Sequence, residues 1–363
     1  MSGAGLRVVR AGVLTTVQDL GRPGHAHLGV PRSGALDEPA HRLANRLLGN
    51  AERAATLETT VDGCAVRLTR DAGDERDGGD DAEGAARRTG TGVGTRTGTR
   101  TGTGTEAVVT GAPCAVTVDG RPAPWGVPFR VPWGAVLEAG PAERGLRSYV
   151  AFAGGVDAEP VLGSRATDLL SGLGPEPLRE GTRLRLGDPH GCDSGRDRDA
   201  VRKGNRRPEP YRRTDGTPER NGHRPPEHGR TAGLRPAPDA APWAAPPREL
   251  LLPVVHGPRA DWFTDGALRT LATGAYRVSA DGNRIGLRLE GPVLERSRDG
   301  ELPSEGIALG ALQVPPEGRP VLFLADHPVT GGYPVIGVVP QEALAAAAQA
   351  VPGTPVRFMP VSG

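Results

Sequence analysis

The sequence predicts a mainly β protein with a few helices, folded into two lobes. The chain contains 54 glycines and 36 prolines but only 4% aromatic residues, a composition that favours short strands and turns over long helices. Its 363 residues exceed the usual size of a single hydrophobic core. We therefore expect two lobes, each of which buries a core of its own.

The first lobe is expected to contain short strands and one helix. Asp37 is a favourable N-cap, Pro39 suits the first helical turn and Gly49 follows the last apolar position, so a helix is predicted between Asp37 and Gly49. The Gly- and Pro-rich run from Gly21 to Gly34 predicts a long loop before it. The expected strands are Leu6–Arg10, Val13–Val17, Ala107–Thr110, Ala115–Val118, Ala135–Glu138 and Leu146–Phe152.

Two polar stretches divide the chain. Residues 71–105 hold Asp, Gly and Arg clusters and then a Thr-Gly alternation; they bury too little to offset their ordering entropy, so we expect a disordered insertion. A ligand-binding flap is the alternative, although the repeat has no large side chains to hold a ligand. Residues 188–247 are polar and rich in Arg and Pro, which predicts a low-complexity linker between lobes 1–187 and 248–363.

The second lobe again combines short strands with helices. Its expected strands are Leu250–His256, Tyr276–Ser279, Ile285–Leu289, Ile307–Val314, Pro320–Leu324 and Val335–Val339. Helices are expected at Asp261–Ala272 and Gln341–Ala350.

Lysine is almost absent, and this excludes several mechanisms. Lys203 is the only lysine among 44 basic residues, and it lies in the linker. A P-loop needs a lysine for the phosphates, a Schiff-base enzyme needs a buried amine, and a biotin carrier needs a lysine to acylate. The chemistry is therefore expected to depend on arginine, carboxylates, amides, hydroxyls and backbone N–H groups.

Charge, hydropathy and cysteine usage limit the partners and the location. The net charge is +1 with no basic stripe, so neither nucleic acid nor an anionic membrane is an expected partner. Residues 1–17 lack an export segment and no run reaches the roughly 20 apolar residues of a membrane span, so a cytoplasmic location is expected. Cys64, Cys114 and Cys192 are odd in number and far apart, which predicts inert thiols.

The linker holds residue types that bind metals elsewhere, namely His190, Cys192, His223 and His228. A disordered chain does not hold ligands at a fixed geometry, so no metal site is predicted there.

The first segment dense in functional groups runs from Thr15 to Glu58. Gln18, Asp19 and Arg22 lie at a predicted strand end, where an amide, a carboxylate and a guanidinium could fix a small polar ligand. The alternative is that Asp19 and Arg22 pair across a turn and cap the loop.

The second segment runs from Ser304 to Gly337. Asp326 follows a predicted buried strand, a position where burial can adjust a carboxylate for proton transfer. Thr330, Gly331 and Gly332 could present a hydroxyl and backbone N–H groups to an oxyanion. The alternative is a tight turn in which Asp326 serves as an Asx cap.

These segments resemble a known family. Together with the run from Asn283 to Gly291, Gly154-Gly155 and the run from Leu162 to Asp168, they are similar to the biotin-dependent carboxyltransferase or allophanate-hydrolase-subunit-2-like family. The resemblance covers the chain outside the two polar stretches. It implies two cyclophilin-like β-barrel lobes and a 5-oxoprolinase C-type subunit. Such a subunit works with separate A and B subunits, ATP and Mg²⁺ to open the lactam 5-oxo-L-proline to L-glutamate.

The resemblance also implies site residues. Asp19 and Asp326 are the expected catalytic carboxylates, which would steer water or bind magnesium. The expected substrate-binding residues are Gln18, Arg22, Ser33, Arg284, Gln313, Thr330, Gly331, Gly332 and Tyr333.

Two other functions occur among the relatives. One is a Kip-type regulatory protein that sequesters a B-like antikinase partner, and the other is carboxyl transfer to a urea-like substrate with biotin on another chain. This sequence also departs from the family pattern, because it reads Asp281-Gly282-Asn283-Arg284-Ile285-Gly286 where Ser-Asp-Arg-Met-Gly is usual. It also has His327-Pro328 after Asp326, where Arg-Gln is usual.

Overall fold

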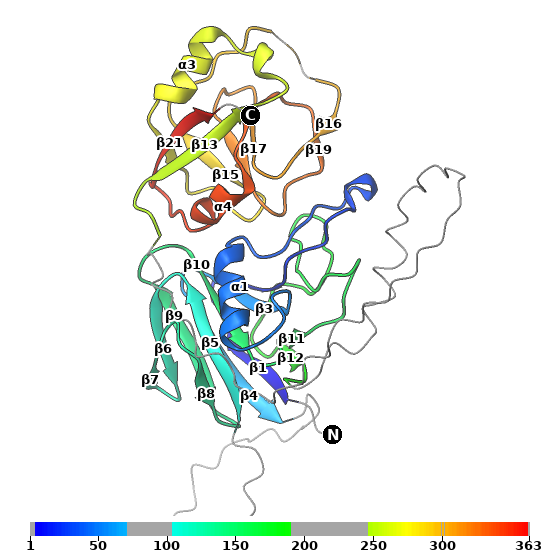
Figure 1. Cartoon of the computed structure of the whole chain (residues 1–363), viewed down its shortest axis with the longest axis vertical. Helices are drawn as coiled ribbons and strands as arrows, with labels where there is room; N and C mark the ends of the chain where they lie inside the picture. The colour runs from blue at the N-terminus through cyan, green and yellow to red at the C-terminus, as the bar shows by residue number, and fades with distance from the viewer. Residues whose placement is uncertain (1–3, 71–103, 190–245, 299, 301, 362–363) are drawn as a thin grey trace, which may run out of the picture.

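The computed structural model describes residues 4–70, 104–189, 246–298, 300 and 302–361. Strands dominate and form two lobes (Figure 1), so the predicted mainly β class is confirmed. The expected insertion and linker lie almost entirely outside the described residues, and the lobe limits therefore stay predictions.

The N-terminal lobe consists of two sheets around one core. A seven-stranded sheet has the order β11-β12-β1-β4-β9-β6-β7, and a five-stranded sheet has the order β2-β3-β10-β5-β8. Apolar side chains from both sheets, such as Val66 and Leu57, share a single buried cluster. The strands are β1 Ala4–Arg10, β2 Leu14–Gln18, β3 Thr56–Thr60, β4 Cys64–Arg70, β5 Thr105–Gly111, β6 Cys114–Val118, β7 Arg121–Ala123, β8 Phe129–Val131, β9 Val136–Ala142, β10 Arg147–Phe152, β11 Val156–Asp157 and β12 Arg183–Leu186.

The C-terminal lobe contains the barrel expected from the family resemblance. Seven strands close in the order β13-β20-β17-β18-β15-β14-β21, around a core that includes Leu252, Leu322 and Phe358. Closure removes the free edges that an open sheet would have. The strands are β13 Leu250–His256, β14 Tyr276–Val278, β15 Gly286–Glu290, β16 Glu305–Gly306, β17 Ala311–Gln313, β18 Val321–Phe323, β19 Thr330–Gly331, β20 Val335–Val338 and β21 Pro355–Val361, and the helices are α3 Asp265–Thr273 and α4 Gln341–Ala348.

The predicted helix near Asp37 is confirmed as α1, which covers Glu38–Leu47. The Asp37 side chain accepts a hydrogen bond from the Ala40 N–H at 3.0 Å, which satisfies one of the free donors of the first turn. The helix buries one face against the five-stranded sheet, and Ala44 packs there with Val108 of β5. None of the helices in the described ranges is long and apolar enough to cross a membrane.

The predictions missed or misjudged several strands. The strands that were not predicted are β3, β4, β7, β8, β11, β12, β16, β19 and β21. β3 was missed because Thr56–Thr60 is polar at nearly every position, and β21 was missed because Pro355–Val361 begins and ends near prolines. The predicted strand Ile307–Val314 shortens to β17, because Gly310 has a left-handed φ of 80° and turns the chain before Ala311.

The barrel lies on the end of the N-terminal lobe that carries α1, with α4 on the facing side (Figure 1). Contacts cross this junction at several points. Leu36, just before α1, belongs to the core of the barrel lobe. The Ser33 N–H donates to the Ala325 carbonyl at 3.0 Å. The long loop before α1 is therefore held between the lobes.

Two glycines with the same backbone conformation provide a matched test of the N-terminal lobe. Gly63 and Gly120 have φ values of 74° and 72°, so alanine at either site costs about 1–2 kcal/mol of left-handed strain. A Cβ at Gly63 would also lie 2.0 Å from the Ala139 carbonyl oxygen, whereas nothing lies within 4 Å at Gly120. We expect Gly63→Ala to cost roughly 1–3 kcal/mol more than Gly120→Ala in urea unfolding. Equal losses would contradict this packing.

His41 of α1 predicts a pH dependence of stability. Burial lowers the pKa of His41 to about 4, whereas an unfolded histidine titrates at about 6.5. Between these two pH values, His41 binds a proton in the unfolded chain but stays neutral in the native state. The free energy of unfolding should therefore fall by up to about 3 kcal/mol as the pH drops through this window. His41→Asn should show a shallower decline over the same range, and an unchanged slope would contradict this account.

Candidate functional site

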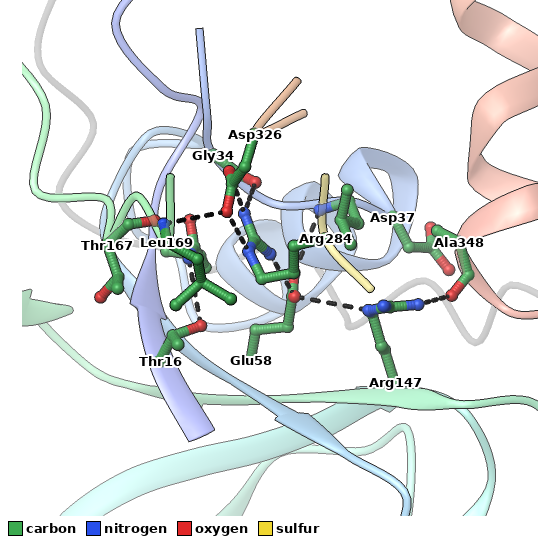
Figure 2. A network of polar contacts seen from close by, with 12 residues as sticks. Thr16, Gly34, Asp37, Glu58, Arg147, Thr167, Leu169, Arg284, Asp326 and Ala348 are labelled. Carbon is green, nitrogen blue, oxygen red and sulfur yellow. Dashed lines mark hydrogen bonds and ion pairs between the residues drawn. The ribbon is translucent and has the colours of Figure 1, made fainter. Parts of the chain in front are cut away.

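A buried arginine lies at the centre of the junction between the lobes. Arg284 lies just before β15, and its Nε and Nη2 atoms donate to the two oxygens of Asp326 at 2.9 and 3.1 Å. Its Nη1 atom donates to Glu58 of β3, and Nη2 also donates to the Gly34 carbonyl at 2.7 Å. Figure 2 shows the guanidinium between the two carboxylates. One fully buried cation therefore joins an acid of each lobe.

Asp326 is held by protein donors on both oxygens. Besides the two bonds from Arg284, one oxygen accepts from the Ser33 hydroxyl at 2.7 Å and the other from the Leu169 N–H at 3.2 Å. The side chain is completely buried. The Asx-cap alternative is not what the carboxylate does, because its partners come from distant segments. Both oxygens are thus engaged by donors within the protein. The predicted catalytic role of Asp326 stays a prediction.

Glu58 is held by donors on both oxygens as well. Leu36 N–H and the Tyr149 hydroxyl donate to the same oxygen at 3.0 and 2.8 Å. Burial alone would raise the pKa of Glu58, but the facing Arg284 and Arg147 guanidiniums lower it below its usual value. Glu58 is therefore an anion in the protein interior.

Gln349, just after α4, connects the barrel lobe to the start of β10 in the other lobe. Its Oε1 accepts from the Leu146 and Arg147 N–H groups, both at 2.9 Å. Its Nε2 donates to the Arg147 carbonyl at 2.9 Å and to Asp37 at 2.8 Å. Arg147 in turn donates to the Ala348 carbonyl. A single glutamine thus satisfies four polar groups of the N-terminal lobe.

Asp19 organises a loop. One oxygen accepts from the Gly21 N–H at 2.7 Å and the Ser164 hydroxyl at 2.6 Å, and the other accepts from the Arg165 N–H at 2.7 Å. The alternative interpretation was that Asp19 and Arg22 pair across a turn and cap the loop. Asp19 does cap its turn. Within the described part of the chain, no ion pair or hydrogen bond joins the Asp19 carboxylate to Arg22.

Arg22 is buried with its guanidinium directed at the 161–168 segment. It donates to the Val161 carbonyl at 3.3 Å and to the Ala166 carbonyl, and it lies 3.8 Å from an oxygen of Asp168. Burial lowers the pKa of Arg22. The side chain is fully buried, so it stabilises a loop and does not present an open face to a ligand.

The structure joins the two predicted segments through Thr167. Gln18 Nε2 donates to the Thr167 carbonyl at 3.0 Å, and the Ser33 hydroxyl lies 3.1 Å from the same oxygen. Because Ser33 also reaches Asp326, the strand end at Gln18, the long loop and the second segment converge. The predicted residues that occupy this one region of the junction are Gln18, Asp19, Arg22, Ser33, Arg284 and Asp326.

The remaining predicted residues form a second group. Gln313 Nε2 donates to the Tyr333 carbonyl at 3.2 Å, and Thr330–Gly331 pairs with Glu305–Gly306 as a two-stranded ribbon. Among the described residues, no hydrogen bond connects this group to Asp19 or Asp326. Its predicted role in substrate binding, Gly332 included, stays a prediction.

The buried ions Glu58, Arg284 and Asp326 are here called the charge cluster. Two cavities open beside it. The first, here called the helix cavity, has a volume of about 330 Å³ and lies between α1 and α4, with Ser33 and Arg42 in its wall. The second, the loop cavity, has a volume of about 230 Å³ and is walled by residues 22–32 of one lobe and by 307–309 and 327–329 of the other. Arg32 lines both.

Sequence reasoning missed several polar residues of the junction. They are Arg32, Asp37 as an interlobe acceptor, Glu58, Arg147, Tyr149 and Gln349. Arg32 had a local signal, since it lies within the polar loop beside Ser33. Asp37 was expected only as a helix cap and Glu58 only as the end of the first dense segment, and Arg147, Tyr149 and Gln349 had no local signal, because their partners are remote in sequence.

We expect two arginine substitutions to differ greatly in how much they lower the free energy of unfolding. Arg284→Gln leaves Asp326 buried without its cation and Glu58 with only Arg147 at 3.6 Å, and breaking such a buried pair costs about 3–5 kcal/mol. Arg298→Gln removes the pair with Asp261, whose side chains are 55% and 52% exposed, and should cost less than about 1 kcal/mol. Urea unfolding of the full chain measures both. A loss at Arg284 no greater than at Arg298 would rule out the junction described.

Comparison with known proteins agrees with this architecture. The chain is 30% identical over 362 residues to the C subunit of 5-oxoprolinase from Escherichia coli (strain K12), covering 98% of this chain and 91% of that protein. It is 27% identical to the urea amidolyase of Lachancea kluyveri over 98% of this chain, but this region is only 17% of that longer protein.

The fold also recurs in a solved structure. The crystal structure of the K. lactis urea amidolyase matches with a TM-score of 0.71 at 24% identity, over 100% of this chain and 19% of that chain. The family described as carboxyltransferase domain, subdomain A and B, matches residues 28–73 and 94–360. Because that match spans most of both lobes, the chain belongs to the carboxyltransferase-domain family.

Proposed function

We propose that this chain is one component of a multi-subunit, ATP-dependent 5-oxoprolinase that hydrolyses 5-oxo-L-proline to L-glutamate. The observation that carries the proposal is the similarity to the E. coli 5-oxoprolinase component over 91% of that protein's length. In this proposal, separate A and B subunits complete the enzyme, and the chain alone is nearly inactive.

The chemistry of lactam hydrolysis requires a rigid site that positions the reactants, and the junction of two lobes can provide one. A lactam is a poor electrophile, so ATP is expected to phosphorylate its carbonyl oxygen before water attacks. Catalysis of that step depends mainly on positioning and on stabilising charge. The buried ions around Arg284 fix the walls of both cavities, and this rigidity supports a positioning role.

The described residues do not fit a magnesium site. No group of three or more His, Cys, Asp or Glu side chains within the described ranges could hold a metal ion. The oxygens of Asp19 and Asp326 already accept bonds from protein donors. In this proposal ATP and Mg²⁺ belong to the assembled complex, and no step on this chain passes through a metal ion.

A second function is favoured by one observation. The 27% identity to a urea amidolyase is compatible with carboxyl transfer to a urea-like substrate, with biotin supplied on another chain. The Kip-type regulatory function is the third candidate, and it requires binding to a B-like partner without turnover.

Reconstitution separates the three. The chain should be combined with A- and B-type subunits of its own source, or with those of E. coli in place of their own C component. We expect glutamate release from 5-oxo-L-proline that needs ATP and all three proteins. An unchanged rate when this chain is omitted would contradict the proposal. A stable complex without lactam turnover would favour the regulator, and carboxylation of urea in the presence of a biotinylated carrier would favour the transferase.

A further inference from the structure

The loop cavity has a wall whose charged and titratable side chains are basic. Among its described lining residues these side chains are Arg22, His25, Arg32 and His327, with neither Asp nor Glu. Arg22 and Arg32 are each paired with a carboxylate outside the lining, Asp168 and Glu38, so the wall favours an anion through its arginine donors. The cavity volume of about 230 Å³ suits a small anion.

Arg32 is the arginine of this wall that can reach a ligand. Its hydrogen bonds within the described structure both use Nη2, which donates to Glu38 at 2.5 Å and to the Leu20 carbonyl at 3.4 Å. The Nε and Nη1 donors have no hydrogen-bond partner in that part of the chain. The side chain is 24% exposed, in contrast to the enclosed Arg22. Nε and Nη1 lie on different edges of the guanidinium, so either can donate one charge-assisted hydrogen bond to a carboxylate.

His327 contributes an acceptor instead of a charge. Its Nδ1 lies 2.8 Å from the Pro328 carbonyl, and because a carbonyl can only accept, Nδ1 carries the hydrogen. Burial lowers the pKa of His327, which favours the neutral ring. Nε2 is then an unprotonated acceptor on a residue of the cavity wall.

The rest of the wall is apolar. Most of it consists of compact side chains from both lobes, and the ones that matter for shape are Val30, Pro31, Ile307, Leu309 and Val329. Such surfaces cover ring methylenes and leave the polar contacts to a few groups, as is usual in small-molecule sites.

We propose that the loop cavity binds a small cyclic carboxylate that also carries an amide N–H. The Arg32 guanidinium pairs with the carboxylate, His327 Nε2 accepts the amide hydrogen, and the apolar wall covers the ring. This inference rests on the proposed function, whose substrate has these groups, and adds the place where it binds and the residues that select it.

Binding of three related molecules tests the inference. They are 5-oxo-L-proline, cyclopentanecarboxylate, which lacks the amide, and 2-pyrrolidone, which lacks the carboxylate. Titration calorimetry on the full chain should give the tightest binding for 5-oxo-L-proline. Arg32→Gln should weaken it by about tenfold or more, and His327→Phe by about two- to tenfold. His327→Gln, which restores an acceptor, should recover part of the loss.

The pattern across ligands distinguishes recognition from general damage. His327→Phe should leave cyclopentanecarboxylate binding unchanged, and Arg32→Gln should leave 2-pyrrolidone binding unchanged. Arg42→Gln is the matched control, because Arg42 is also a partly exposed, ion-paired arginine but lines only the helix cavity. An equal loss with Arg42→Gln, or an equal effect of His327→Phe on both carboxylates, would overturn the inference.

The same variants in the reconstituted complex separate this inference from the proposed function. Arg32→Gln and His327→Phe should raise KM for 5-oxo-L-proline more than they lower kcat. If the wild-type complex releases glutamate while both variants keep its KM, the site fails and the function stands. If the complex is inactive but the chain shows the expected binding pattern, the function fails and the site stands. If neither the chain nor the complex binds any of the three molecules, the inference is overturned.

Discussion

The structure depends on a buried cation between two buried anions. Arg284 connects Asp326 of its own lobe to Glu58 of the other, and Arg147 adds a second positive charge 3.6 Å from Glu58. Taking ions out of water is costly, and the cost is offset only when each charge is paired and hydrogen-bonded. Separating the lobes would leave Glu58 without its main partner. The charges therefore specify one arrangement of the lobes, and the barrel cannot rotate against the sheets without breaking them.

This constraint also shapes the loop on which the cavities depend. The segment between β2 and α1 passes between the lobes, and Ser33 within it adopts a left-handed φ of 56°. That conformation is uncommon for a residue with a side chain. It is maintained here because the Ser33 N–H and hydroxyl bond to the barrel at Ala325 and Asp326. Arg32, the next residue back, is thereby fixed at the boundary of both cavities.

Local signals in the sequence predicted much of the fold but only part of the site. The helix α1 was predictable because its cap at Asp37 and its terminating Gly49 are adjacent to it in the chain. β3 was not, because a threonine-rich strand with Glu58 at its centre has no apolar alternation. The main partner that stabilises Glu58 in the core is Arg284, which lies 226 residues away. Gln349 was missed for the same reason, since a glutamine after an alanine-rich helix carries no local mark of its four distant partners.

The buried charges should make the two lobes unfold as one cooperative unit. Differential scanning calorimetry of the full chain near neutral pH measures this cooperativity. A single transition is expected, with calorimetric and van't Hoff enthalpies that agree. Two separate transitions, with the barrel and the sheet lobe melting independently, would contradict it.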